Sequence, residues 1–173
     1  MLDVLRMVTD WLGNASHGVD AKLTALDFDG SDSKPTGTLT IGDETRNASV
    51  AVGKYPSTTF GLAVQVQPMD TLDGQSATYT HDYDVPLLLR LNRQSSDAAA
   101  ATRDLLYTLR ATVQSLEALF NDTIAAAVSA RTRNGVQAQH IVSMGQALTR
   151  EQREDNVVTA AIAITIRARD TLA

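Results

Sequence analysis

The chain has 173 residues and a formal net charge of −5, and 43% of its residues are hydrophobic. This length suits one domain with a substantial core, and this composition excludes wholesale disorder. The acidic balance argues against general nucleic-acid binding, because neutralising phosphates requires a basic surface. The absence of cysteine excludes disulfides and thiolate metal sites. We expect no signal peptide, since Asp3 and Asp10 interrupt the N-terminus, and no apolar run approaches the roughly 18 residues of a membrane span.

The acidic and the basic residues are each dominated by one residue type. Aspartate greatly outnumbers glutamate, and only Lys22, Lys34 and Lys54 are lysines among the 15 basic residues. A preference for arginine fits a GC-rich genome, whereas an aspartate-rich and lysine-poor chain also fits a high-salt host. Both explanations stay open, because net charge informs solubility and not fold.

The first part of the chain predicts two short helices followed by strands. Leu2, Leu5, Val8 and Leu12 share one face of a predicted helix over residues 2–12, and a second short helix is expected over residues 19–26. Residues 27–37 are rich in Asp, Ser, Gly and Pro, which is typical of a loop. Residues 39–41 and 50–52 form a weak hairpin signal around residues 42–44. Residues 60–66 alternate in the manner of a strand.

The middle of the chain carries a strand and then the longest predicted helix. Residues 79–92 alternate as a strand, in which Pro86 indicates an edge position or a bulge. Residues 97–120 contain neither Gly nor Pro, and Ser96 or Asp97 is a suitable helix cap. The expected apolar face of this helix is Leu106, Leu109, Val113, Leu116 and Phe120.

The last part of the chain returns to strands. A helical piece is expected over residues 124–133, a strand over residues 136–144, and a final strand over residues 158–168. In the final strand Val158, Ala160 and Ile162 begin an apolar row, while the alternate positions are small or polar and end in arginine. The predicted fold class is α+β, with an antiparallel or mixed sheet packed against one long central helix and a short N-terminal helix. We expect a single domain over residues 1–173.

One short motif has a catalytic counterpart. Asp27-Phe28-Asp29-Gly30-Ser31 resembles the acidic loop of haloacid-dehalogenase-type phosphotransferases, in which the first carboxylate attacks phosphorus and the second serves as acid and base beside Mg²⁺. That chemistry requires a hydrophobic strand before the loop and a parallel sheet. Here Asp20, Lys22 and Thr24 break the preceding segment. A small Mg²⁺-dependent phosphohydrolase using Asp27 and Asp29 is therefore a minor alternative.

Metal binding has little support in the sequence. Asp27 does not open an EF-hand loop, because Gly30 and Thr38 occupy the wrong positions. On a strand His81 points away from Asp82 and Asp84, since side chains alternate between faces. His17, His81 and His140 are scattered. We predict no metal, no cofactor and no catalytic residue.

Four arginines are candidates for an interface. Arg131 and Arg133 lie before the penultimate strand, and Arg167 and Arg169 end the last one. They either meet acidic partners or keep an edge strand from pairing with other chains. Both interpretations stay open.

The order of the predicted elements resembles a tail terminator (tail completion) protein of long-tailed phages and archaeal tailed viruses. The matching parts are MLDVLRMVTDWLG at the start, the strands FGLAVQV and VPLLLRLN, the helix DLLYTLRATVQSLEALF, and the closing strand VVTAAIAITIRAR. The resemblance is architectural and covers most of the chain. Against this pattern, residues 27–56 form a loop or hairpin insertion.

The resemblance implies a structural virion protein and not an enzyme. It implies a ring, expected to be a homohexamer, that caps the tail tube, ends its polymerisation and joins tail to neck. Its partners are then copies of itself, the tail tube protein and a neck or head-completion protein, with no specific nucleic-acid recognition and no membrane. Its location is the virion after assembly in the host cytoplasm. The alternatives are a neck or head-completion adaptor and a tail-tube subunit. If arginine contacts hold the ring, Arg167→Glu impairs assembly and leaves the monomer folded.

Overall fold

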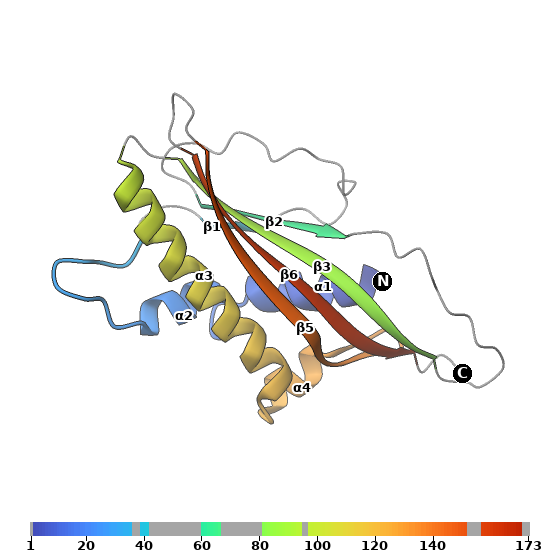
Figure 1. The fold of residues 1–173 in the computed structure, drawn as a ribbon. Helices are drawn as coiled ribbons and strands as arrows, with labels where there is room; N and C mark the ends of the chain where they lie inside the picture. The colour runs from blue at the N-terminus through green and yellow to red at the C-terminus, as the bar shows by residue number, and fades with distance from the viewer. Residues whose placement is uncertain are drawn as a thin grey trace.

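We describe the fold from a computed structural model that places residues 2–35, 39–41, 60–66, 81–94, 97–151 and 157–170. The helices are α1 (Leu2–Leu12), α2 (Val19–Ala25), α3 (Ala98–Asn121) and α4 (Ala125–Ala130). The strands are β1 (Leu39–Ile41), β2 (Phe60–Val66), β3 (His81–Gln94), β4 (Thr132–Arg133), β5 (Val136–Glu151) and β6 (Val157–Asp170). They form one sheet in the order β1-β2-β3-β6-β5-β4 (Figure 1). The predicted α+β class is confirmed, with the long helix α3 packed on the sheet.

The centre of the sheet is a set of three long antiparallel strands, with β6 between β3 and β5. β2 continues the sheet antiparallel to β3, and β1 then pairs parallel to β2. Pro86 is opposite Thr165 of β6, and among the described residues the pairing of β3 with β2 reaches the neighbouring Leu87. The edge position or bulge predicted at Pro86 stays a prediction, because the residues after Val66 lie outside the described part.

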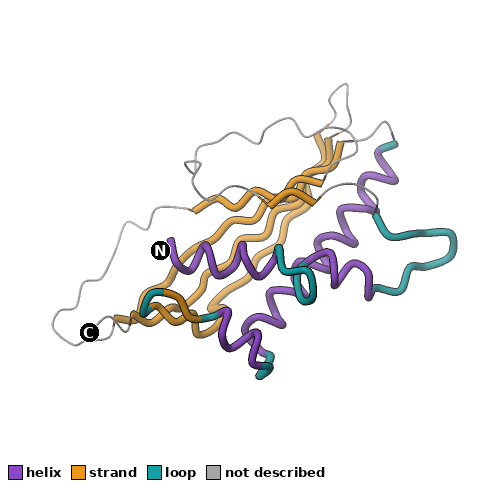
Figure 2. Tube along the Cα trace, turned by 180° about the vertical axis from the view of Figure 1, so that it is seen from behind, coloured by secondary structure: helices purple, strands orange, loops and turns teal. Residues whose placement is uncertain are grey.

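One face of the sheet carries the core. Alternate residues of β6 are at most 1% exposed, and they belong to one cluster with the buried residues of α1, α2 and α3. This row is Val158, Ala160, Ile162, Ile164, Ile166 and Ala168. Figure 2 shows α1 crossing over the strands on the helical side. The alternation of the last strand thus predicted the covered face correctly, because side chains on one strand point alternately to opposite faces.

Helix α3 begins as the sequence predicts. The Asp97 carboxylate accepts hydrogen bonds from the backbone N–H groups of Ala99 and Ala100 at 3.0 and 3.1 Å. These groups have no carbonyl partner in the first helical turn, so the side chain satisfies them. Asp97, and not Ser96, is the N-cap.

The buried face of α3 differs from the predicted one. Leu106 is 48% exposed, so the expected stripe is wrong there, whereas Val113 is half-buried and packs against the core. Thr108, Thr112 and Ser115 are instead fully buried. The hydroxyls of Thr108 and Thr112 donate to the carbonyls four residues earlier at 2.8 and 2.7 Å, and Ser115 donates to His17 O at 3.1 Å. Because each hydroxyl is bonded, these residues enter the core without an unpaired polar group.

Two further differences concern the chain around β5. The helical piece expected over residues 124–133 ends at Ala130, and its last part forms the short strand β4. The strand expected over residues 136–144 extends to Glu151. In the first half of the chain, residues 50–52 lie outside the described part, and the described β1 runs parallel to β2.

Candidate assembly surface

The face of the sheet opposite the core is open among the described residues. Register partners on antiparallel strands point to the same side, so Arg167 shares this face with His140, and Ala163 shares it with Gly145. Ala163 and His140 are exposed, and a side chain built at Gly145 would meet no atom within 4 Å. The layer of described helices therefore covers one side of the sheet only.

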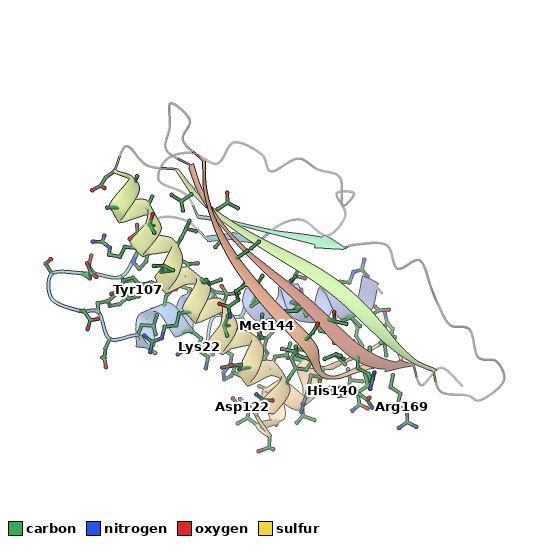
Figure 3. The ribbon with its side chains drawn as sticks, viewed as in Figure 1. Lys22, Tyr107, Asp122, His140, Met144 and Arg169 are labelled. Carbon is green, nitrogen blue, oxygen red and sulfur yellow. The ribbon has the colours of Figure 1, made fainter. Side chains whose placement is uncertain are left out.

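The two arginines of β6 lie at one end of this open face. Arg167 has register partners His140 on β5 and Asp84 on β3, and Arg169 has register partners Gln137 and Asp82. Arg167 is half-buried, whereas Arg169 is exposed. Figure 3 shows Arg169 and His140 at the same end of the strands. The register places acidic positions of β3 directly opposite both arginines, an arrangement that favours cross-strand ion pairs.

Arg131 and Arg133 have partners within the chain. Arg131 Nη1 donates to the carbonyl of Phe120 at 2.7 Å, which binds one of the free carbonyls at the end of α3. Arg133 Nη1 lies 2.8 Å from Asp10 Oδ2, and its Nε lies 3.7 Å from Asp3 Oδ1. Both contacts stabilise the subunit itself. The predicted interface role of the four arginines stays a prediction, and Arg169 is the most accessible of them.

A small groove lies beside the Arg133 contacts. It is lined by residues of α1, α4 and β4 with their connections: Met7, Asp10, Trp11, Asn14, Ala126, Ser129, Ala130, Thr132 and Arg133. Its only charged lining residues, Asp10 and Arg133, are paired with each other. It therefore offers no unpaired charge to orient a ligand.

The acidic loop after α2 docks on the outer side of α3. Arg103 Nη1 lies 2.9 Å from Asp32 Oδ1, and the Tyr107 hydroxyl donates to Asp32 Oδ2 at 2.9 Å. The Phe28 ring meets the Tyr107 ring edge-on, with centroids 4.8 Å apart. Figure 3 shows Tyr107 on the side of α3 that faces this loop. Phe28 of the sequence motif thus supplies packing, and Asp32 just after the motif supplies the ion pair, and together they hold the loop on the helix.

The ionisable groups of this contact are perturbed in a consistent direction. The hydrogen bond to Asp32, together with burial, raises the pKa of Tyr107 above its ordinary value. The hydrogen bond to Asp104, with the charge of Asp32, raises the pKa of Arg103. Both shifts favour the protonated forms of Tyr107 and Arg103, which are the forms that donate hydrogen bonds to the carboxylates.

The same loop lacks the surroundings of a phosphotransferase. It follows the helix α2 and not a hydrophobic strand. Asp27 and Asp29 are exposed, and Gly30 has a φ of 61°, a left-handed turn conformation that glycine adopts readily. The sheet order also contains no βαβ series of parallel strands among the described residues. The context that this motif requires is therefore missing here.

The structure tests only some of the candidate metal ligands, because the side chains of His81, Asp82 and Asp84 lie outside the described part. In the backbone register His81 is opposite Asp170, and Asp82 and Asp84 are opposite Arg169 and Arg167. His17 stacks on Trp11, with ring centroids 5.1 Å apart, far in the chain from His140 on β5. Within the described ranges, no group of three or more His, Cys, Asp or Glu side chains is placed to hold a metal ion.

The edge of the sheet formed by β5 is a feature that the sequence analysis missed. β4 pairs with Val136 and Gln137 only, and the carbonyl of Arg131 accepts from Ala138 N at 2.8 Å. Beyond Ala138 no other described strand bonds this side of β5. Val142 is 46% exposed in this stretch. The signal was present in the sequence, because residues 136–149 contain no Asp, Glu, Lys or Arg.

No protein-family model matches the chain, and no curated protein matches it either. In the part of the chain that the structure describes, no helix is long and apolar enough to span a membrane.

Proposed function

We propose that this protein is a structural virion subunit that forms a ring, caps the tail tube of a tailed virus and joins tail to neck. The observation that carries the proposal is a sheet covered by helices on one side only, with its other face and its β5 edge open among the described residues. A subunit that works alone gains nothing from a long open strand, whereas a ring uses such surfaces for repeated contacts.

The charge distribution supports assembly by stacking. The chain is acidic overall, and Arg169 is exposed at one end of the open face. Complementary charge on neighbouring rings gives orientation and rate of association more than affinity. In this proposal the partners are further copies of the chain, the tail tube protein and a neck or head-completion protein.

The test is negative-stain imaging of the purified protein with native mass measured at low and at molar salt. Rings of about six subunits, as the family resemblance implies, support the proposal, and a requirement for molar salt would indicate a halophilic host. Purified tube protein then supplies the functional assay, in which added ring protein stops tube growth. Tubes that keep their uncontrolled length in its presence contradict a terminator.

A neck adaptor and a tail-tube subunit are separated by the same assay. A tube subunit polymerises by itself into long stacks of rings. A neck adaptor forms rings that leave tube growth unchanged and bind the head instead. A phosphohydrolase has no specific observation in its favour, because Asp27 and Asp29 lie exposed on a loop after a helix.

A further inference from the structure

The β5 edge, defined here as residues 142–147, is bonded on one side only by the described strands. β5 is 16 residues long and is bonded to β6 along one side. On its other side the described structure bonds only its first residues, through β4 and Arg131. Backbone N–H and C=O groups require partners, so a strand edge of this length is a template for another strand.

The β5 edge also lacks the devices that normally protect an edge. Proteins block edges with charged residues, proline, bulges or short strands. Residues 136–149 contain neither charge at neutral pH nor proline, although 20% of the chain is charged. Register shifts occur between Ala138 and His140 and between Ile141 and Ser143, but the pairing with β6 is regular from Ser143 to Glu151. The edge is therefore straight and unprotected from Ser143 onward, and Val142 borders this part in the last register shift.

The side chains of this edge are mostly exposed, and none of them is charged. Val142 is 46% exposed, and Ser143, Gly145, Gln146 and Ala147 are exposed beside it. None of them carries a charge that would have to be desolvated when a second strand approaches. An uncharged and exposed edge is suited to burial in an interface.

β1, the strand at the opposite edge of the described sheet, runs in the direction that an antiparallel partner of β5 requires. β1 bonds only β2 among the described strands, and it runs parallel to β2. β2 is antiparallel to β3, and β3 and β5 are both antiparallel to β6, so β1 is antiparallel to β5. A second copy placed beside the first in the same orientation therefore brings its β1 antiparallel to β5. Repetition of this contact is head-to-tail, and a head-to-tail contact forms a ring when the rotation between successive copies closes on itself.

We infer that the β5 edge binds the β1 strand of a second copy of this chain, which continues the sheet from subunit to subunit. The inference rests on the proposed function, since a ring is the assembly in which both sheet edges of every copy are occupied by copies. Strand addition supplies backbone hydrogen bonds, and uncharged side chains at the β5 edge permit close approach.

The first experiment compares two valines of nearly equal exposure. Val142 on the β5 edge is 46% exposed, and Val128 on α4 is 45% exposed. A lysine at residue 142 places a charge in the proposed interface, where edge lysines block pairing. We expect Val142→Lys to reduce the native mass to that of a single chain, 18.6 kDa, and Val128→Lys to keep the assembly of the unchanged protein. Equal far-UV circular dichroism and melting temperature show that each variant is folded.

The second experiment identifies the partner strand. The natural chain has no cysteine, so introduced thiols react without background. Ser143→Cys and Thr40→Cys place single thiols on β5 and β1. With a short bismaleimide, we expect the double variant to give a ladder of covalent multimers above the dimer, and each single variant to stay as one chain.

The outcomes separate this inference from the proposed function. Covalent dimers from Ser143→Cys alone would mean that β5 pairs with itself, which overturns the inference. Rings that persist in Val142→Lys, together with the absence of a ladder from the double-cysteine variant, overturn the inference as well. That result leaves the proposed function standing. A ladder from a protein that forms no rings supports the strand contact and contradicts the tail-terminator role. An unchanged protein that stays monomeric at its highest soluble concentration overturns the inference.

Discussion

The two long strands β5 and β6 are neighbours in the sheet, yet they have very different environments. β6 lies between two strands, and one of its faces is buried in the core throughout. β5 lies near the edge, and beyond Ala138 most of its described side chains are exposed or only half-buried. The folding of one subunit accounts for the sequence of β6. It does not account for the lack of Asp, Glu, Lys and Arg in residues 136–149 of β5, which the proposed contact with a second copy would explain.

The largest expected effect tests the covered side. Ile164 of β6 is 1% exposed, and we expect Ile164→Ala to lower the free energy of unfolding by about 2–5 kcal/mol, because it leaves a cavity as well as losing apolar contact. Val142→Ala on the open edge should change it by no more than about 0.5 kcal/mol. Urea unfolding of dilute, monomeric protein measures both. Equal losses of unfolding free energy in the two variants would contradict the contrast between the covered β6 and the open edge of β5.

Two glycines sharpen the same contrast. A Cβ at Gly18 would lie 2.3 Å from Leu12 O and 2.5 Å from Asn14 O, both rigid backbone atoms. We expect Gly18→Ala to cost about 1–3 kcal/mol of unfolding free energy. A Cβ at Gly145 meets no atom within 4 Å, so Gly145→Ala should be neutral or stabilising by up to about 1 kcal/mol. Thermal unfolding is the measurement, and destabilisation by Gly145→Ala would show that the open face is covered.

A third pair tests the ends of the covering helix. Asp97 accepts two hydrogen bonds at the start of α3, and we expect Asp97→Ala to lower the free energy of unfolding by about 1 kcal/mol. Asp122 follows the end of α3 and is exposed, where a negative charge opposes the helix dipole. Asp122→Ala should therefore be neutral or slightly stabilising. Chemical denaturation distinguishes the two, and an equal loss at Asp122 would contradict the capping explanation.

The smallest expected effect concerns the loop on the outer side of α3. The Asp32 hydrogen bond raises the pKa of Tyr107, so the folded state holds this proton more tightly than the unfolded chain does. The stabilisation is therefore present below the ordinary tyrosine pKa of about 10 and is lost as the pH rises through the folded value. The difference between the ultraviolet titrations of the unchanged protein and Tyr107→Phe isolates this group. We expect Asp32→Asn to lower its pKa, and an unchanged titration would contradict the contact.

Local patterns were sufficient for several elements. The helix over residues 2–12, the cap at Asp97 and the buried row of β6 follow from spacing and side-chain chemistry, and the structure places them as predicted. These features depend on residues close in sequence, so their patterns are readable before folding.

Tertiary structure decided the rest. Apolar spacing misplaced Leu106, because packing selects the side of α3 on which Thr108 and Thr112 satisfy their hydroxyls with helix carbonyls. The partners of Arg131 and Arg133 are a helix end and carboxylates distant in sequence. The sequence by itself determined which residues alternate and where the long helix begins. Only the strand order made β6 a central strand and left the part of β5 without Asp, Glu, Lys or Arg at an edge of the described sheet, since pairing between distant segments depends on the whole fold and not on either segment.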